Sequence, residues 1–145
     1  MSRVINPDSA GKERTRLCKS IVLSIRELMK QTEPDGKSLD LAAFIATALL
    51  EIHATVDSSV QAWEKRGYWV KADRFRMEWE WTKQMGENVR SAVLKDNWAE
   101  IAILAVRVGQ KLMNVEVSAK HRLGSPWVGA WLRLQQENKL AGSPK

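Results

Sequence analysis

Apolar residues recur every three or four positions along four long stretches of this chain, and that spacing predicts helices. The stretches cover residues 9–31, 38–66, 68–94 and 97–114. Ser38 is a plausible N-cap for the second of them. No segment alternates apolar and polar residues as a half-buried strand does. Short turns at 32–37, 66–68 and 95–97 make consecutive helices antiparallel neighbours, so we predict an all-α fold, an up-down four-helix bundle.

The end of the chain predicts a smaller element. Residues 115–124 lack helical spacing, and Ser125 followed by Pro126 favours the start of a short extra C-terminal helix. Trp127 and Trp131 stand one turn apart in that helix, where they either dock on the bundle or bind a partner. The chain is therefore predicted to contain a four-helix bundle over residues 1–114 and a basic, tryptophan-containing tail over residues 115–145, with the short helix packing on the bundle.

The first predicted helix is basic on one side. Five cations fall within roughly 80° of one another on a helical projection. They are Lys12, Arg16, Lys19, Arg26 and Lys30. The opposite arc is apolar and carries Leu17, Cys18, Ile21, Val22, Ile25, Leu28 and Met29. Such a helix buries one face and presents a row of positive charges to a partner, of which a polyanion is the simplest.

The charge of the whole chain is uneven. The net charge is +6, with eight Lys/Arg against five Asp/Glu in residues 1–37, eight against nine in 38–96, and seven against three in 97–145. The excess at both ends indicates that the first helix and the tail face an acidic partner. The competing interpretation is a generally basic protein without such a partner.

Aromatic and basic residues interleave between residues 63 and 81. The aromatic residues are Trp63, Tyr68, Trp69, Phe75, Trp79 and Trp81, and the cations are Lys65, Arg66, Lys71, Arg74 and Arg76. Rings beside cations are suited to stacking on unpaired bases while the cations hold phosphates. The alternative is a core face with Phe75 and Trp79 inward and a solvated charge ladder outside. The candidate nucleic-acid-binding residues are Lys12, Arg16, Lys19, Arg26, Lys30, Lys65, Arg66, Lys71, Arg74, Lys120 and Arg122.

Signals of catalysis are weak. His53 and Asp57 have i, i+4 spacing but no second ligand pair, and His121 lies in a basic Lys-His-Arg run. The sequence has no glycine-rich phosphate loop, no Cys-x-x-Cys and no nucleophile elbow. We therefore expect no enzyme, no metal and no cofactor. Cys18 is the single cysteine and no apolar stretch approaches about 18 residues, so we expect a cytoplasmic protein without a membrane segment.

One family resemblance is carried by three short segments. They are Lys71-Ala72-Asp73-Arg74-Phe75-Arg76, the turn at Lys95-Asp96, and Gly109-Gln110-Lys111-Leu112. Within residues 40–113 the chain resembles the accessory variability determinant proteins of diversity-generating retroelements, whose fold is similar to that of the 23S rRNA intervening-sequence proteins. The resemblance implies an antiparallel four-helix bundle assembled into a ring, commonly a pentamer, whose basic surface engages a reverse transcriptase and its template RNA. The N-terminal extension and the tail after residue 115 depart from that pattern, and no site residue is transferred by a motif.

The sequence as a whole predicts a non-catalytic accessory protein that binds nucleic acid. RNA is preferred over DNA because of the resemblance, which also implies a reverse transcriptase as partner. We expect a homo-oligomer because helix 97–114 is apolar almost all round and the chain holds seven tryptophans. The alternative is an oligomeric protein-protein interaction scaffold whose basic surface meets an acidic protein.

Overall fold

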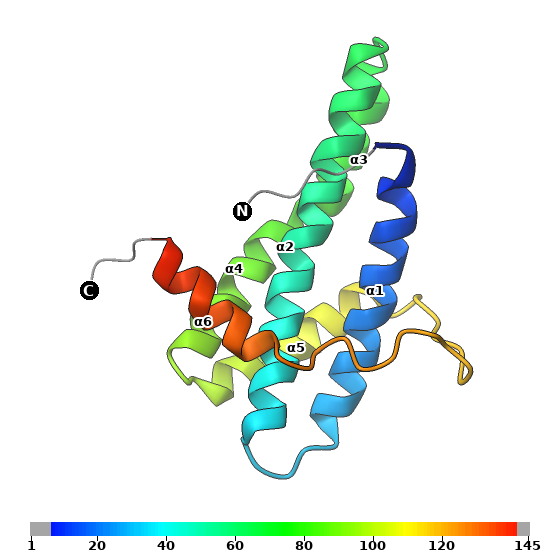
Figure 1. The fold of residues 1–145 in the computed structure, drawn as a ribbon. Helices are drawn as coiled ribbons and strands as arrows, with labels where there is room; N and C mark the ends of the chain where they lie inside the picture. Colours follow the sequence, from blue (N-terminus) through cyan, green and yellow to red (C-terminus); the bar gives the residue numbers. More distant parts are fainter. Residues whose placement is uncertain (1–6, 142–145) are drawn as a thin grey trace.

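The computed structural model describes residues 7–141, with side chains from Ser9 onward. Over this range the chain forms six helices and no strand, which confirms the predicted all-α class (Figure 1). The helices are α1 (Pro7–Met29), α2 (Gly36–Lys65), α3 (Trp69–Trp79), α4 (Trp81–Leu94), α5 (Trp98–Lys111) and α6 (Ala130–Leu140). The outermost parts of the two predicted domains, residues 1–6 and 142–145, lie outside the described residues.

The turns between helices are fixed by local hydrogen bonds. At the end of α2, the backbone N–H of Tyr68 donates to the carbonyl of Trp63 and that of Gly67 to the carbonyl of Glu64. This pattern requires a left-handed residue, and Gly67 supplies it with φ of +81°. The break predicted at Arg66 and Gly67 is thereby confirmed.

Three helix boundaries differ from the prediction. Asp35, rather than Ser38, caps α2, because its carboxylate accepts the backbone N–H of Ser38 at 2.9 Å. The helix expected over 68–94 is interrupted at Glu80. Next to this break, the Thr82 hydroxyl donates a hydrogen bond to the carbonyl of Trp79. Residues 125–129 form turns rather than helix, and α6 starts only after Gly129, whose φ of +81° is incompatible with a continuous helix.

The long apolar helix α2 lies at the centre of the packing. It contacts α1, α3, α4 and α6, whereas α5 packs mainly on α4 and touches α1 only lightly. Figure 1 shows α1, α2 and the α3–α4 pair running up and down side by side, with α5 passing obliquely behind them. This packing does not establish the predicted up-down order of four helices, because α5 makes few contacts with the first helix.

Helices α2 and α4 approach closely at Gly86. A β-carbon built on Gly86 would lie 2.9 Å from side-chain atoms of Leu50 and 3.1 Å from the β-carbon of Leu49. Gly86 is buried, and Val89 and Val93 continue the buried face of α4 against the same helix. The absence of a side chain at residue 86 therefore sets the distance between the two helices.

The tail helix α6 is attached to α2 through Asp40. The two carboxylate oxygens of Asp40 accept the backbone N–H groups of Gly129 at 3.1 Å and Trp131 at 2.9 Å, next to the first turn of α6. Trp127 is 8% exposed and Leu134 is buried. Of the two alternatives left open by the sequence, the structure has both tryptophans docked within the same chain, with Trp131 half-buried in the packing.

Helix α2 also corrects the expectation about apolar stretches. It contains an 18-residue window with a mean hydropathy of 1.6, long and apolar enough to cross a membrane by length and composition alone. Other parts of the structure bury 61% of that window. The core helix of a globular protein has the same properties, and α2 occupies that position here.

Candidate nucleic-acid interface

The five cations of the first helix share one exposed face, as the helical projection predicts. Lys12, Arg16, Lys19, Arg26 and Lys30 are all exposed on α1. We call them the basic stripe. The opposite arc faces the core, with Leu17, Cys18 and Ile21 buried. The prediction that Met29 belongs to the buried arc is wrong, because α1 ends at Met29 and its side chain is 65% exposed.

Two members of the basic stripe are paired with acids of the same helix. Arg16 donates two hydrogen bonds to the carboxylate of Glu13, at 3.1 and 2.7 Å, and these raise the pKa of Arg16. Glu27 contacts Lys30 at 3.3 Å and Lys37 at 3.4 Å, and the hydrogen bond from Lys30 is the main cause of its lowered pKa. The unpaired charge of the stripe comes from the three members for which the described residues provide no ion pair. They are Lys12, Lys19 and Arg26.

Arg14 lies on the core side of α1, and its structural role was not identified from the sequence. Its guanidinium carbon lies 4.6 Å from the ring centroid of Phe75 and 5.9 Å from that of Trp79, and Nη1 donates to the Thr55 hydroxyl at 3.1 Å. Burial lowers the pKa of Arg14, against an opposing effect of Cys18. The i, i+4 spacing of Arg14 to the core residue Cys18 was the available signal.

The interleaved aromatic segment divides into an inner and an outer group. Trp63 and Phe75 pack edge to face with centroids 4.9 Å apart, and Trp79 lies 6.2 Å from Phe75. Lys71 stands with Nζ 4.6 Å over Trp63, so this candidate cation covers an inner ring. Such contacts are typical of packing between helices. The core interpretation therefore holds for the inner group.

Arg76 belongs to the same structural group. Its guanidinium joins Glu64 of α2, at 2.7 Å, and Asp73 of α3. The hydrogen bond with Glu64 is the main cause of the raised pKa of Arg76. Arg76 therefore pairs with both Glu64 and Asp73. The cations closer to the α2–α3 turn do not have these two acids as partners.

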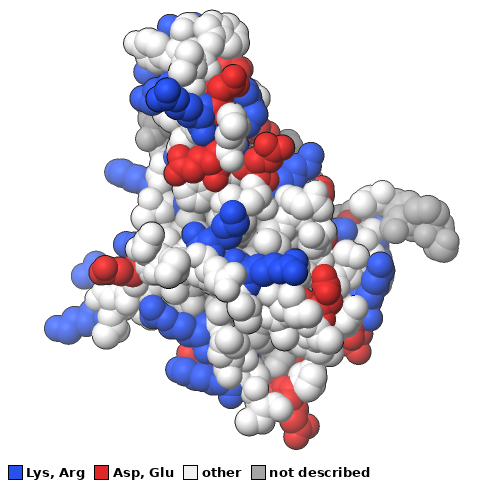
Figure 2. All heavy atoms as spheres, turned by 180° about the vertical axis from the view of Figure 1, so that it is seen from behind, with Lys and Arg blue, Asp and Glu red and all other residues white. Residues whose placement is uncertain are grey.

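The outer group lies at the α2–α3 turn. Tyr68 is 53% exposed and Trp69 is 62% exposed, and the nearby cations Lys65, Arg66 and Arg74 are exposed as well. We call the exposed residues Lys65, Arg66, Tyr68, Trp69 and Arg74 the tip surface. Figure 1 shows this turn projecting beyond the rest of the molecule, and Figure 2 shows the same end as an uncharged cap bordered by Lys and Arg together with acidic side chains. The structure thus presents two rings and three cations at one protruding end.

The tail cations lie elsewhere. Lys120 and Arg122 are exposed in the segment between α5 and α6, where the backbone N–H of Leu123 donates to Nδ1 of His121 at 3.2 Å. In Figure 1 this segment lies beside the lower half of α1, away from the tip surface. The candidate residues therefore form three separate areas, the basic stripe, the tip surface and the tail loop.

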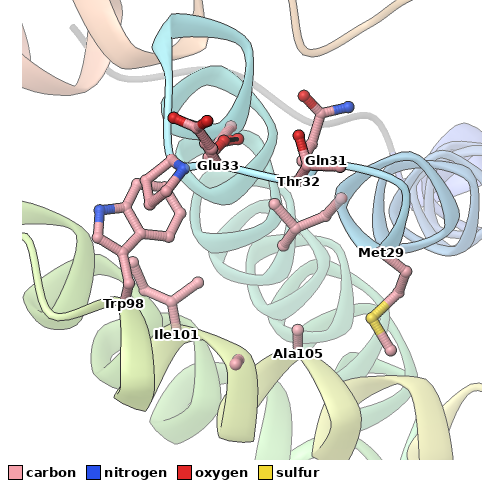
Figure 3. Close-up of a pocket in the computed structure, with 11 residues that line it drawn as sticks. Met29, Gln31, Thr32, Glu33, Trp98, Ile101 and Ala105 are labelled. Carbon is pink, nitrogen blue, oxygen red and sulfur yellow. Dashed lines mark hydrogen bonds between the residues drawn. The ribbon is translucent and has the colours of Figure 1, made fainter.

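An apolar hollow of about 170 Å³ lies between the end of α1, the following turn and α5. Leu28, Trp98 and Ile101 are among its lining residues, with Glu33 the one acid at its edge (Figure 3). Catalysis by this arrangement would require further polar groups that converge on the hollow. The hollow is better suited to apolar contact than to reaction chemistry.

The described residues contain no group of three His, Cys, Asp or Glu placed to hold a metal. His53 Nε2 lies 3.6 Å from Asp57, and the buried Nδ1 has no hydrogen-bond partner there. Burial raises the pKa of Cys18 to about 11, so its thiol stays protonated and unreactive at neutral pH. Of these groups, Cys18 belongs to the buried core, whereas Asp57 is exposed.

Comparisons with known proteins add no relative. No family model, no curated protein and no solved structure matches the chain. The resemblance to retroelement accessory proteins therefore rests on the sequence segments alone.

Proposed function

We propose that this chain is a non-catalytic, cytoplasmic accessory protein that binds single-stranded nucleic acid, RNA in preference to DNA, at its tip surface. The observation that carries the proposal is the exposure of Tyr68 and Trp69 at a projecting turn, beside Lys65, Arg66 and Arg74. Exposing a large aromatic ring to water is unfavourable, and stacking on a base removes part of that apolar surface from water. The adjacent cations are placed to neutralise the phosphates of the same strand.

The basic stripe is proposed as a second, sequence-independent phosphate contact. Lys12 stands near the end of α1 that packs on α3, since its neighbour Arg14 contacts Phe75. A strand that leaves the tip surface along α1 would meet Lys12 first and then Lys19 and Arg26. These contacts add affinity and salt dependence without reading bases.

The finer features implied by the family resemblance belong to the same proposal. They are a preference for RNA, a reverse transcriptase as the partner enzyme, and an up-down arrangement in which α5 acts as the fourth member of the bundle. The antiparallel run of α1, α2 and α3–α4 supports the last of these.

The tip surface is tested by replacing its two rings. We expect Trp69→Ala and Tyr68→Ala each to weaken binding of a fluorescent single-stranded RNA about fivefold or more, because one stacked base is worth about 1–3 kcal/mol. Fluorescence anisotropy at fixed salt gives the dissociation constants. Met77→Ala is the matched control, since Met77 is 75% exposed on the same helix and outside the tip surface. Equal affinities for all four proteins would exclude stacking at the tip.

The basic stripe is tested by its effect on salt dependence. Reversing Lys12, Lys19 and Arg26 to glutamate should reduce the slope of log affinity against log salt by about 2, at about 0.7 per phosphate contact. Lys139→Glu on α6 is the control for a single charge reversal outside the stripe. An unchanged slope would remove the stripe from the interface and leave the tip surface as the binding site.

A protein-interaction scaffold is the second candidate, and one observation favours it. Ile103 is 49% exposed and Val106 is 45% exposed on α5, so an apolar helix face is turned toward solvent. If the purified protein failed to bind single-stranded RNA or DNA at low salt, this reading would replace the first.

A further inference from the structure

The outward side of α5 has the spacing of a helix-pairing seam. Five exposed positions follow intervals of four, three, four and three residues, and they are Ala99, Ile103, Val106 and Gln110 of α5 and Met113 in the turn just after it. The buried residues Ile101, Leu104 and Val108 face the rest of the fold from the other side of the helix. We call the exposed set the α5 seam. A period of 3.5 residues is the pattern by which one helix keeps a stripe against another along its length.

Charged residues follow one edge of the α5 seam. Glu100 comes one position after Ala99, and Arg107 comes one position after Val106, so the two share an edge, one heptad apart. Both are exposed, and neither has an ion pair within residues 9–141. The opposite edge carries the small residues Ala102 and Gly109. The seam therefore has a charged edge and an edge that allows close approach.

The difference between the two edges indicates which partner binds the α5 seam and in which orientation. When two identical helices pair in antiparallel fashion about a two-fold axis, each edge lies beside the same edge of the other copy. Glu100 then lies beside Arg107 of the second copy, and Ile103 lies opposite Val106. In a parallel pair the charged edge would face Ala102 and Gly109, and both charges would stay unpaired.

We infer that the α5 seam binds a second copy of this chain in antiparallel orientation, with two symmetric Glu100–Arg107 pairs at its edge. A contact of this kind uses the same surface on both chains, so no free copy of that surface remains to bind a third chain. It therefore forms a dimer, in place of the five-membered ring that the family resemblance implies. The inference does not depend on nucleic-acid binding, because it involves neither the tip surface nor the basic stripe.

Light scattering after size exclusion tests the seam. The unmodified chain is expected near 33 kDa, twice the 16.5 kDa of one chain, across micromolar concentrations. Ile103→Glu should give the mass of one chain, because it places a charge at the centre of the seam. Leu132→Glu is the matched control, since Leu132 is 59% exposed on α6 and should leave the dimer intact. Circular dichroism melting verifies that each variant folds.

A charge exchange tests the orientation without disturbing the apolar residues. Glu100→Lys alone and Arg107→Glu alone each bring like charges together, so each should raise the dimer dissociation constant about tenfold, since symmetry applies the change twice. The double variant E100K/R107E restores opposite charges and should return to within about threefold of the unmodified chain. Only an antiparallel pair explains such a rescue.

Three results would overturn the inference. One is a mass of 16.5 kDa for the unmodified chain at every concentration. Another is a larger assembly that Ile103→Glu leaves unchanged. The third is a double variant that associates no better than the single variants, which would exclude the antiparallel pairing even if the chain dimerises.

Discussion

Arg14 places a positive charge at the interface of α1, α2 and α3. Its guanidinium lies over Phe75 and donates to the Thr55 hydroxyl, so one side chain joins three helices. A partly desolvated cation of this kind stabilises the fold through its aromatic contacts and loses much of its hydration in return. The exposed members of the basic stripe, two of which pair with acids on the same helix, have no comparable role in packing.

Replacement of Arg14 should therefore be costly, whereas replacement of Arg16 should not. We expect Arg14→Met to lower the free energy of unfolding by about 1–3 kcal/mol, because the cation–π contacts and the hydrogen bond to Thr55 are lost. Arg16→Met removes only a surface pair and should cost under about 1 kcal/mol. Urea unfolding followed by circular dichroism measures both, and equal effects would contradict the structural role of Arg14.

Cys18 predicts a decrease in stability at alkaline pH. Burial raises the pKa of its thiol to about 11, above the unfolded value of about 8.5. Between these values the unfolded chain releases the proton and the folded chain keeps it, so stability falls as pH rises, by at most about 1.4 kcal/mol per unit. The difference in slope between the unmodified chain and Cys18→Ala, from urea unfolding at several pH values, isolates this group. Parallel slopes would show that the thiol titrates alike in both states.

At the scale of the helices, periodicity along the chain predicts which segments are helical, and contacts distant in sequence decide where several of them end. The buried arc of α1 and the turn at Gly67 follow from spacing and from one glycine. The start of α6 depends on Asp40, which lies about 90 residues earlier in the chain and leaves no trace in the local pattern near Gly129. The break at Glu80 depends on a hydroxyl contact that a count of apolar positions does not include.

The same limit explains what could be predicted of the candidate site. Exposure of the basic stripe follows from the amphipathic pattern of one helix. The division of the aromatic segment into inner and outer residues does not follow from that pattern. It depends on contacts between helices, because Phe75 packs against Trp63 on α2 and Arg14 on α1. Tyr68 and Trp69 remain outside because the turn they occupy projects beyond α1.

Two glycines in helices should respond in opposite ways to alanine. Gly86→Ala forces a β-carbon to 2.9 Å from Leu50, so we expect it to destabilise the fold by about 1–3 kcal/mol. Gly11 lies exposed in α1, where a β-carbon meets only the end of Arg14 at 3.8 Å, and Gly11→Ala should stabilise by about 0.5–1 kcal/mol. Thermal unfolding compares the two. A stabilising Gly86→Ala would show that α2 and α4 are not tightly packed there.

On the scale of the whole molecule, the surface contains three areas of different chemistry. The tip surface combines rings and cations at one projecting end, the basic stripe extends along α1, and the α5 seam is apolar with one charged edge. Arg14, Asp40 and Gly86 hold the helices that position these areas. The proposed nucleic-acid contact lies at one end of the fold and the proposed self-association on another helix, so that each can be removed by separate substitutions.

The most direct test of the central claim is a photochemical crosslink to single-stranded RNA that contains 4-thiouridine, followed by trypsin and mass spectrometry. Cleavage after Arg66 and Lys71 releases residues 67–71, a peptide that carries both Tyr68 and Trp69. Cleavage after Arg122 and Arg133 releases residues 123–133, which carry Trp127 and Trp131 and serve as an internal comparison. We predict the crosslink on 67–71 and little on 123–133, where Trp127 is buried. A crosslink confined to 123–133, or none at low salt, would contradict it.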